Sequence, residues 1–192
     1  MGKKGKLFII SAPSGSGKTT LCSKLIAGRA GKRKLVRSIS ATTRRRRRGE
    51  RQGGDYFFIS TKEFLKRRRA GRFLEWARVL GSFYGTPRDF VEEHINHGED
   101  VLLSIDVQGA LKVKRRGFKA VFIFILPPSL RELKRRLKRR STEDKREIAR
   151  RLKLAREEMG FVKEYNYLVL NDKIKTALAK LKEIIRLERR AE

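Results

Sequence analysis

A glycine-rich loop between an apolar run and an amphipathic segment constrains the fold of this chain most. The run Lys6 to Ala12 has strand character, the segment Thr19 to Ala27 has helical spacing, and glycines at 15 and 17 lie between them. These glycines let successive N–H groups converge on one point, and the helix start adds its positive end. Strand, loop and helix in this order match a Walker A loop, so we predict binding of a nucleoside triphosphate.

Each residue type in the loop has an expected chemical role. Lys18 is expected to reach the β- and γ-phosphates, and the Thr19 hydroxyl to bind Mg²⁺. Ala12 replaces the first glycine of the strict pattern with another small residue. A glycine-rich turn that arose by chance is the alternative, but it does not explain three elements in register. The expected triphosphate-binding residues in the loop are Ala12, Pro13, Ser14, Gly15, Ser16, Gly17, Lys18, Thr19 and Thr20.

Five apolar runs alternate with helical segments along the chain. Several are continuously hydrophobic, as strands buried on both faces of a parallel sheet are. Strands that alternate with helices imply crossover connections, so we expect an α/β fold with a P-loop NTPase-type parallel sheet flanked by helices. A chain of 192 residues suits one such domain. The five runs are Lys6 to Ala12, Leu35 to Ala41, Val101 to Asp106, Ala120 to Leu126 and Tyr167 to Asn171.

Capping signals mark the starts of several helices. Ser60 with Glu63, and Ser129 with Glu132, have the spacing of capping boxes, the second opening a helix through Arg140. Further helices are expected at Pro87 to His97, which Gly98 would end, at Glu143 to Phe161 and at Lys173 to Arg189.

Two stretches interrupt the alternation of strands and helices. Residues 38–86 are strand-rich and aromatic, which indicates a small inserted subdomain. Residues 129–156 are dominated by Lys and Arg around a polar turn, as a mobile helical lid would be. The core is then expected to comprise residues 1–37, 87–128 and 157–192.

The charge of the chain is its most unusual bulk property. Fifty Lys and Arg against 21 Asp and Glu give a formal net charge of +29, which attracts polyanions. A solvated basic surface on a phosphate-handling enzyme is the other interpretation, and we expect only weak, non-specific binding of nucleic acid.

No run of about 18 apolar residues is present, so no membrane span is expected. The single Cys22 excludes an intrachain disulfide and favours the cytoplasm. Nothing in the sequence indicates the oligomeric state.

A series of short motifs follows the loop. They are Ser40-Ala41-Thr42-Thr43-Arg44, Arg47-Arg48-Gly49-Glu50, Gly54-Asp55-Tyr56, Phe73-Leu74-Glu75-Trp76-Ala77, Tyr84-Gly85-Thr86, Ile105-Asp106-Val107-Gln108-Gly109 and Ile125-Leu126-Pro127-Pro128-Ser129. In order and spacing the chain resembles the guanylate kinase family from the loop nearly to the C-terminus. The resemblance implies a purine nucleotide kinase that moves the γ-phosphate of ATP to GMP or dGMP. Residues 38–86 would bind GMP, and residues 129–156 would form the lid.

The resemblance also implies how GMP is held. Arg44 and Arg47 would bind its phosphate through bidentate forks. Glu75 would face the N1–H and N2–H₂ donors that distinguish guanine from adenine. Tyr56 and Tyr84 could instead be core aromatics, and Thr86 before Pro87 could also cap a helix. The implied GMP set is Ser40, Arg44, Arg47, Tyr56, Glu75, Tyr84, Thr86 and Asp106.

Asp106 ends an apolar strand, as a Walker B acid does, and could either hold Mg²⁺ with Thr19 or touch GMP. The family usually has a second acid two residues earlier, where this chain has Ser104. Ser104 therefore removes one carboxylate from the expected network around the metal and the guanine, which would affect turnover.

Arginines of the lid would stabilise the charge of the transferred phosphoryl group. By resemblance, Asn171 lies near the adenine of ATP, although it could instead cap a helix that begins at Asp172. The implied catalytic residues are Lys18, Arg44, Arg136, Arg140 and Arg151.

Two other functions are compatible with parts of the sequence. A related P-loop kinase of a phosphorylated ribose would share the loop, but it has no use for Glu75 with Thr86 as readers of guanine. A basic, non-catalytic guanylate-kinase-like binding module would tend to lose the loop, and this chain keeps Lys18 and Thr19.

Overall fold

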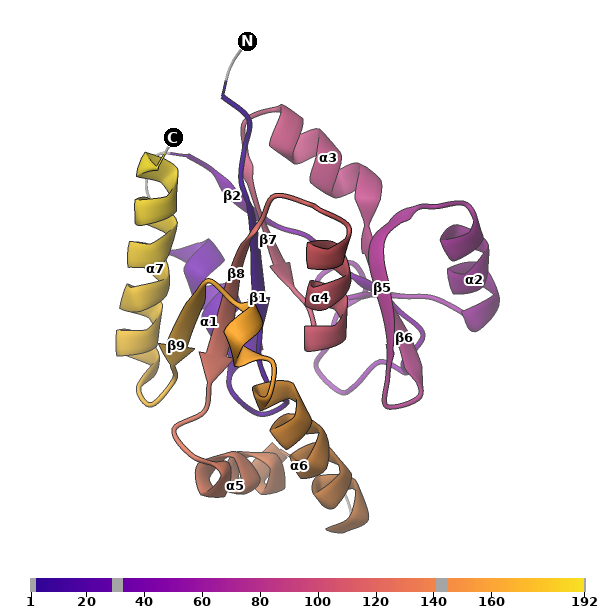
Figure 1. Cartoon of the computed structure of the whole chain (residues 1–192). Helices are drawn as coiled ribbons and strands as arrows, with labels where there is room; N and C mark the ends of the chain where they lie inside the picture. Colours follow the sequence, from indigo (N-terminus) through magenta and orange to yellow (C-terminus); the bar gives the residue numbers. More distant parts are fainter. Residues whose placement is uncertain (1–2, 29–32, 141–144, 192) are drawn as a thin grey trace.

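The computed structural model describes residues 3–28, 33–140 and 145–191 (Figure 1). Its centre is a five-stranded sheet with the order β2-β7-β1-β8-β9, in which every neighbouring pair is parallel. The expected α/β class with a parallel sheet is therefore confirmed. The strands are β1 (Leu7–Ser11), β2 (Leu35–Arg37), β7 (Asp100–Ser104), β8 (Val121–Leu126) and β9 (Tyr167–Leu170).

Helices cover both faces of this sheet (Figure 1). Phe8 and Ile10 of the central strand β1 pack on one face, and Leu7 and Ile9 pack on the other. Burial on both sides explains why the strand is a continuous apolar run. The first face is covered by α1 (Lys18–Ala27) and α7 (Ile174–Arg190), the second by α3 (Arg88–Asn96) and α4 (Val107–Arg115).

A second, four-stranded sheet with the order β4-β3-β6-β5 covers nearly all of the predicted insertion 38–86 and ends one residue beyond it, at Pro87. Its own small core is aromatic, with the ring of Phe64 stacked 4.6 Å from Phe73 and 5.3 Å from Phe83. The elements are β3 (Ala41–Thr42), β4 (Phe57–Phe58), α2 (Thr61–Arg69), β5 (Phe73–Val79) and β6 (Ser82–Pro87).

The predicted single strand from Leu35 to Ala41 was wrong. The backbone N–H of Ser38 still donates to the carbonyl of Leu102 in β7, but the chain then leaves the central sheet. It pairs again at Ala41, in β3, where its neighbours are β4 and β6. The apolar residues of the run serve two different sheets, Leu35 and Val36 in β2 and Ala41 in β3.

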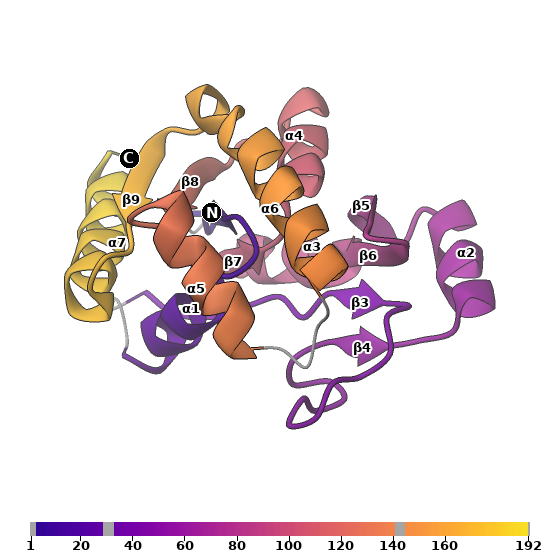
Figure 2. The ribbon, with the colours of Figure 1, turned by 90° about the horizontal axis from the view of Figure 1, so that it is seen from below.

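Two helices, α5 (Leu130–Arg140) and α6 (Lys145–Met159), lie beyond the carboxyl ends of the central strands (Figure 2). Leu133 and Leu137 of α5 pack against Leu152 and Ala155 of α6. This small apolar seam joins the two helices, which otherwise carry mostly charged side chains. A 3₁₀ turn, η1 (Val162–Glu164), connects α6 to β9.

The serine caps of the two predicted capping boxes are confirmed at α2 and α5, while Glu63 and Glu132 pair with arginines one turn along. The hydroxyl of Ser60 accepts from the N–H of Glu63, and that of Ser129 from the N–H of Glu132, each at 3.1 Å. Helix α4 was not predicted from the sequence. It begins after Asp106, whose carboxylate accepts from the N–H of Gly109 at 3.0 Å.

The carboxylate of Asp100 fastens the amino ends of the strands to the C-terminal helix. It is fully buried, and it accepts from the backbone N–H of Lys6 at 2.8 Å and from Nε of Arg189 at 2.6 Å. Arg33 approaches the same carboxylate at 3.4 Å, and Arg189 also donates to the carbonyl of Arg33. One acid therefore links β1, the segment before β2, β7 and α7.

We predict that Asp100→Ala lowers the free energy of unfolding by about 3 kcal/mol, because it leaves two guanidinium groups without their shared acceptor. Denaturant unfolding followed by circular dichroism measures this. The control is Asp89→Ala, since Asp89 pairs with Arg72 at 3.0 Å while both side chains are about two-thirds exposed. That change should cost less than about 1 kcal/mol. Equal losses for the two variants would contradict the assignment.

Candidate active site

The glycine-rich loop wraps the start of α1 in a conformation that needs its glycines. Gly15 and Gly17 have φ of +90° and +88°, which side chains rarely tolerate. A Cβ on Gly17 would lie 2.4 Å from Nδ2 of Asn171, and that amide donates to the carbonyl of Ser16 at 2.7 Å. Asn171 therefore holds the loop from behind. The alternative that it caps a helix is wrong, because α7 begins at Ile174.

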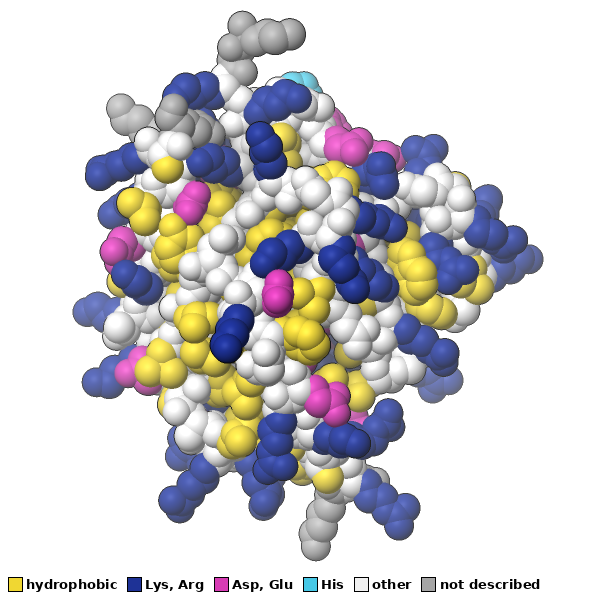
Figure 3. All heavy atoms as spheres, in the orientation of Figure 1, with side chains coloured by type: hydrophobic (Ala, Val, Ile, Leu, Met, Phe, Trp, Pro, Cys, Tyr) yellow, Lys and Arg dark blue, Asp and Glu magenta, His cyan; other side chains and the backbone are white. Residues whose placement is uncertain are grey.

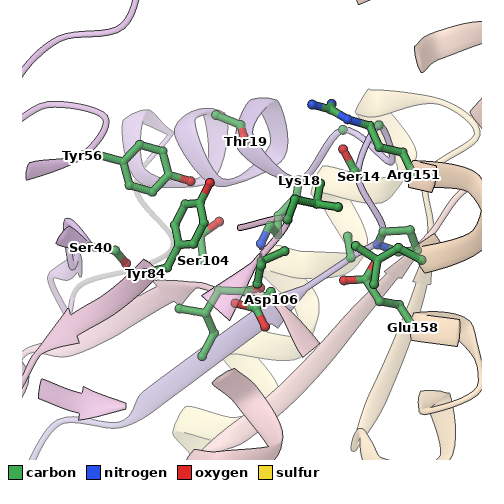
Figure 4. A pocket seen from close by; sticks show the side chains of 18 of the residues that line it. Ser14, Lys18, Thr19, Ser40, Tyr56, Tyr84, Ser104, Asp106, Arg151 and Glu158 are labelled. Carbon is green, nitrogen blue, oxygen red and sulfur yellow. Dashed lines mark hydrogen bonds between the residues drawn. The ribbon is translucent and has the colours of Figure 1, made fainter. Parts of the chain in front are cut away.

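Lys18 begins α1 and points its amine toward the carboxyl end of β7 (Figure 4). Nζ donates to the carbonyl of Ile105 at 2.6 Å. Burial lowers the pKa of the Lys18 ammonium, while negative charge on Cys22, Asp106 and Glu158 opposes that effect. An ammonium has three donors, so the observed bond to one carbonyl leaves capacity for phosphate oxygens.

Glu75 is the most unusual carboxylate of the site. Only 2% of the residue is exposed, and its Oε1 accepts from the hydroxyl of Thr86 at 2.7 Å. Burial raises the pKa of Glu75 to about 7, although the Thr86 hydrogen bond and nearby Lys112 act to lower it. A Cβ at Gly109 would lie 2.6 Å from Oε2, so glycine in α4 makes the room that this carboxylate occupies. The pairing register of β5 also shifts between Phe73 and Glu75, as at a β-bulge, which redirects a side chain.

One pocket brings the predicted residues together from four distant parts of the chain (Figure 4). Tyr56 and Tyr84 lie on one side with their ring centroids 5.9 Å apart, and Arg151 and Glu158 lie on the other. The loop, the second sheet, the end of β7 and helix α6 thus face a common space. The predicted residues that line it are Ala12, Pro13, Ser14, Gly15, Gly17, Lys18, Thr19, Ser40, Arg47, Tyr56, Glu75, Tyr84, Asp106 and Arg151.

A second pocket lies on the other side of the loop, against α5 and the start of α7. Thr20 and Asn171 line it together with Arg136, whose Nη2 donates to the carbonyl of Asn171 at 3.2 Å. Gly15 and Gly17 line both pockets, so the two spaces adjoin across the loop.

Among the predicted residues whose side chains are described, three line neither pocket. Arg44 donates to Glu50 at 2.7 Å, and its guanidinium lies over the ring of Tyr56, 5.5 Å from the ring centroid. Thr86 is buried and donates its hydroxyl to Glu75, so the alternative that it caps α3 is wrong; Pro87 holds that position. Ser16 is buried inside the loop. The side chain of Arg140 lies outside the described residues.

Sequence reasoning missed Glu158, which lines the pocket from α6. Burial raises its pKa to about 7, while Lys18 acts to lower it. Glu158 follows Arg151 by seven residues, two helical turns, so helical spacing could have placed both on one face. Leu80 and Leu154 were also missed, and they line the same pocket from the second sheet and from α6. Leu80 has a positive φ of 47° in the β5–β6 turn.

Comparisons with known proteins agree with this geometry. The family model described as guanylate kinase matches residues 4–188. The chain is 49% identical to the guanylate kinase of Caldanaerobacter subterraneus subsp. tengcongensis, an alignment that covers 97% of this chain and 89% of that one. It is 47% identical to the guanylate kinase of Thermotoga maritima, with 97% and 88% covered.

Among solved structures, the guanylate kinase from Anaplasma phagocytophilum superposes with a TM-score of 0.80 at 34% identity, covering 98% of this chain and 88% of that chain. The matched region contains the loop, the Glu75 carboxylate and the two helices beyond the sheet. A relative at this identity and coverage shares both fold and family. The chain described here belongs to the guanylate kinase family.

Proposed function

We propose that this protein transfers the γ-phosphate of ATP to GMP or dGMP, giving ADP and GDP or dGDP. The observation that carries the proposal is a buried carboxylate, Glu75, in the same pocket as the P-loop ammonium of Lys18. One end of the pocket suits a purine with two adjacent N–H donors, and the other suits a triphosphate. We assign residues 38–86 to the acceptor, residues 129–156 to a lid, and the remainder to the core.

The acceptor is held at both of its ends. Glu75 accepts the N1–H and N2–H₂ of guanine, and Thr86 keeps that carboxylate oriented through its 2.7 Å hydrogen bond. Arg47, exposed at the pocket wall, and Arg44 over the ring of Tyr56 supply the charge that binds the GMP phosphate. Ser40 and Tyr84 complete the wall with hydroxyl groups. Adenine offers an acceptor ring nitrogen at the N1 position, so it leaves the buried carboxylate without a partner.

Phosphoryl transfer then needs positioning more than proton chemistry. An oxygen of the GMP phosphate bonds to the γ-phosphorus while the bond to the β–γ bridging oxygen breaks. A phosphate monoester has its second pKa near 6, so the attacking oxygen is already anionic at neutral pH. Lys18 and the lid residues Arg136, Arg140 and Arg151 are assigned to the charge that develops on the γ-oxygens. Arg151 lines the pocket and donates to Glu147 at 3.1 Å, which supports its assignment to this role.

The oxygen donors at the pocket floor fit Mg²⁺. Thr19 exposes its hydroxyl beside Lys18, and Asp106 presents a carboxylate at the end of β7. Among the described residues no three His, Cys, Asp or Glu side chains cluster as a self-sufficient metal site. That suits an ion held jointly by one or two protein oxygens and by phosphates. When bound, Mg²⁺ would neutralise phosphate charge there.

The rival functions explain less of the site. A kinase of a phosphorylated ribose has no base to meet Glu75, and a non-catalytic module has no need of a lysine aimed into the pocket.

Basic side chains are spread widely over the face seen in Figure 3, and we propose no specific nucleic-acid partner for them. In the described parts of the chain, no helix has the length and apolarity to cross a membrane. With two nucleotides as substrates and one cysteine, the cytoplasm is the proposed location.

The first test is a panel of GMP, AMP, CMP and UMP in a coupled assay of ADP release. We predict activity on GMP alone, and a fall in kcat/KM for GMP of about 100-fold in Glu75→Gln, the loss expected for hydrogen bonds to a charged acceptor. The matched control is Glu63→Gln, which removes a carboxylate that pairs with Arg67 on the surface of α2. Equal use of AMP and GMP by the wild type would defeat the assignment of Glu75.

The second test uses pH. Because burial raises the pKa of Glu75 to about 7, the carboxyl is mostly neutral at pH 6 and mostly ionised at pH 8. GMP needs the ionised form, so its affinity should increase about tenfold from pH 6 to pH 8. Isothermal titration calorimetry measures the affinity at each pH.

Two variants separate Glu75 from other groups that titrate in this range. Glu75→Gln should retain only the smaller dependence that comes from the GMP phosphate itself. Glu158→Gln removes the other pocket carboxyl whose pKa is raised to about 7, and should keep the dependence. A pH profile that persists in Glu75→Gln and vanishes in Glu158→Gln would reverse the assignment.

A further inference from the structure

Arg37 ends β2 on the side of the sheet that faces α1. In the parallel register Arg37 lies opposite Leu102 of β7. Leu35, two residues earlier on the same strand face, packs with Leu102 in the core beneath α1 and α7. Ser104, two residues beyond Leu102, shares that face and lines the active-site pocket. Arg37 is therefore a diagonal neighbour of a pocket-lining residue, one strand away.

The side chain of Arg37 includes a buried donor without an acceptor. The residue is half-buried, and its Nε is fully buried without a hydrogen bond to any described residue. Arg88 is also half-buried with an unbonded Nε, but its Nη1 lies 4.0 Å from the carboxylate of Glu92, and Arg189 donates to Asp100. A buried donor with no acceptor is costly, so an arginine kept in this state points to an acceptor from outside the chain.

Arg37 is not among the residues that line the pocket, but its positive charge reaches residues that are. Burial dominates the pKa values of Lys18, Cys22 and Tyr56, lowering the first and raising the other two, and the positive charge of Arg37 pulls all three downward. Arg37 thus acts on both the P-loop lysine and an acceptor-side tyrosine. Ser104, at the neighbouring position, is neutral and small, so it supplies no counter-charge and little bulk.

We propose that Arg37 is a further phosphate-binding residue, whose guanidinium binds phosphate oxygens over Ser104 where the two nucleotides meet. The inference rests on the proposed kinase function, because that function brings phosphates to this point. A guanidinium fork matches two phosphate oxygens and stays charged at any working pH. The phosphate belongs either to the acceptor or to the γ-position of the donor, and binding measurements distinguish these sources.

The test compares Arg37→Leu and Arg37→Lys with the wild type by isothermal titration calorimetry at fixed salt and excess Mg²⁺. The titrants are GMP, guanosine, ATP and ADP. We expect Arg37→Leu to weaken binding about 10- to 100-fold, as for loss of charged hydrogen bonds, and Arg37→Lys to weaken it less. Loss for GMP but not guanosine identifies the acceptor phosphate, and loss for ATP but not ADP identifies the γ-phosphate.

The control is Arg72→Leu, which removes an exposed arginine of the same charge outside both pockets and should change no affinity by more than about twofold. Thermal unfolding of each variant shows whether the fold persists, and Arg37→Lys carries the test if Arg37→Leu does not fold. Unchanged affinities in a folded Arg37 variant, or equal losses for guanosine and GMP, would overturn the proposal. The proposed function fails separately, if the wild type does not phosphorylate GMP.

Discussion

The structure depends on how the phosphate loop is held between the central strand and the first helix. β1 is buried on both faces and ends directly in the loop, so the loop cannot move without the sheet. From behind, the amide of Asn171 bonds the carbonyl of Ser16 and fills the space against Gly17. From in front, Leu133 and Leu137 of α5 lie against Gly15. An anion site made of backbone N–H groups is effective only if those groups are already oriented, and these contacts orient them.

Two buried carboxylates show how a strongly basic chain uses its few acids. Asp100 receives a backbone N–H and two guanidinium groups, and it binds distant parts of the core together. Glu75 accepts a hydrogen bond from the neutral hydroxyl of Thr86, which offsets only part of the cost of burying its charge. Its pKa therefore rises to about 7. The first acid is satisfied by the protein. The second is left for a ligand with N–H donors to satisfy.

Sequence patterns located the central strands because apolar residues dominate each run, although one run also extended into the second sheet. They predicted helices from apolar spacing, and serine caps marked the starts of α2 and α5. They failed where one residue serves two purposes. Helix α4 was not predicted because it contains Gly109, and glycine disfavours helices. The missing side chain of Gly109 makes room for the carboxylate of Glu75. Thr86 resembled a helix cap, but its hydroxyl belongs to Glu75. Glu158 carries no local motif, and only the packing of α6 brings it to the site; likewise, only the register of β2 with β7 makes Arg37 a neighbour of Ser104.

The connection between β6 and α3 has a mechanical consequence. Pro87 is at once the last residue of β6 and the residue that caps α3, so no loop separates the second sheet from the core at this crossing. The backbone N–H of Arg88 also donates to the carbonyl of Arg72, just before β5, which braces the same corner. The other crossing, between Arg37 and Ala41, has three residues outside any strand. Ser38 is bonded to β7 and the carbonyl of Ser40 accepts from Phe57 of β4, so a swing of the second sheet would pivot on Pro87 and bend chiefly at Ile39.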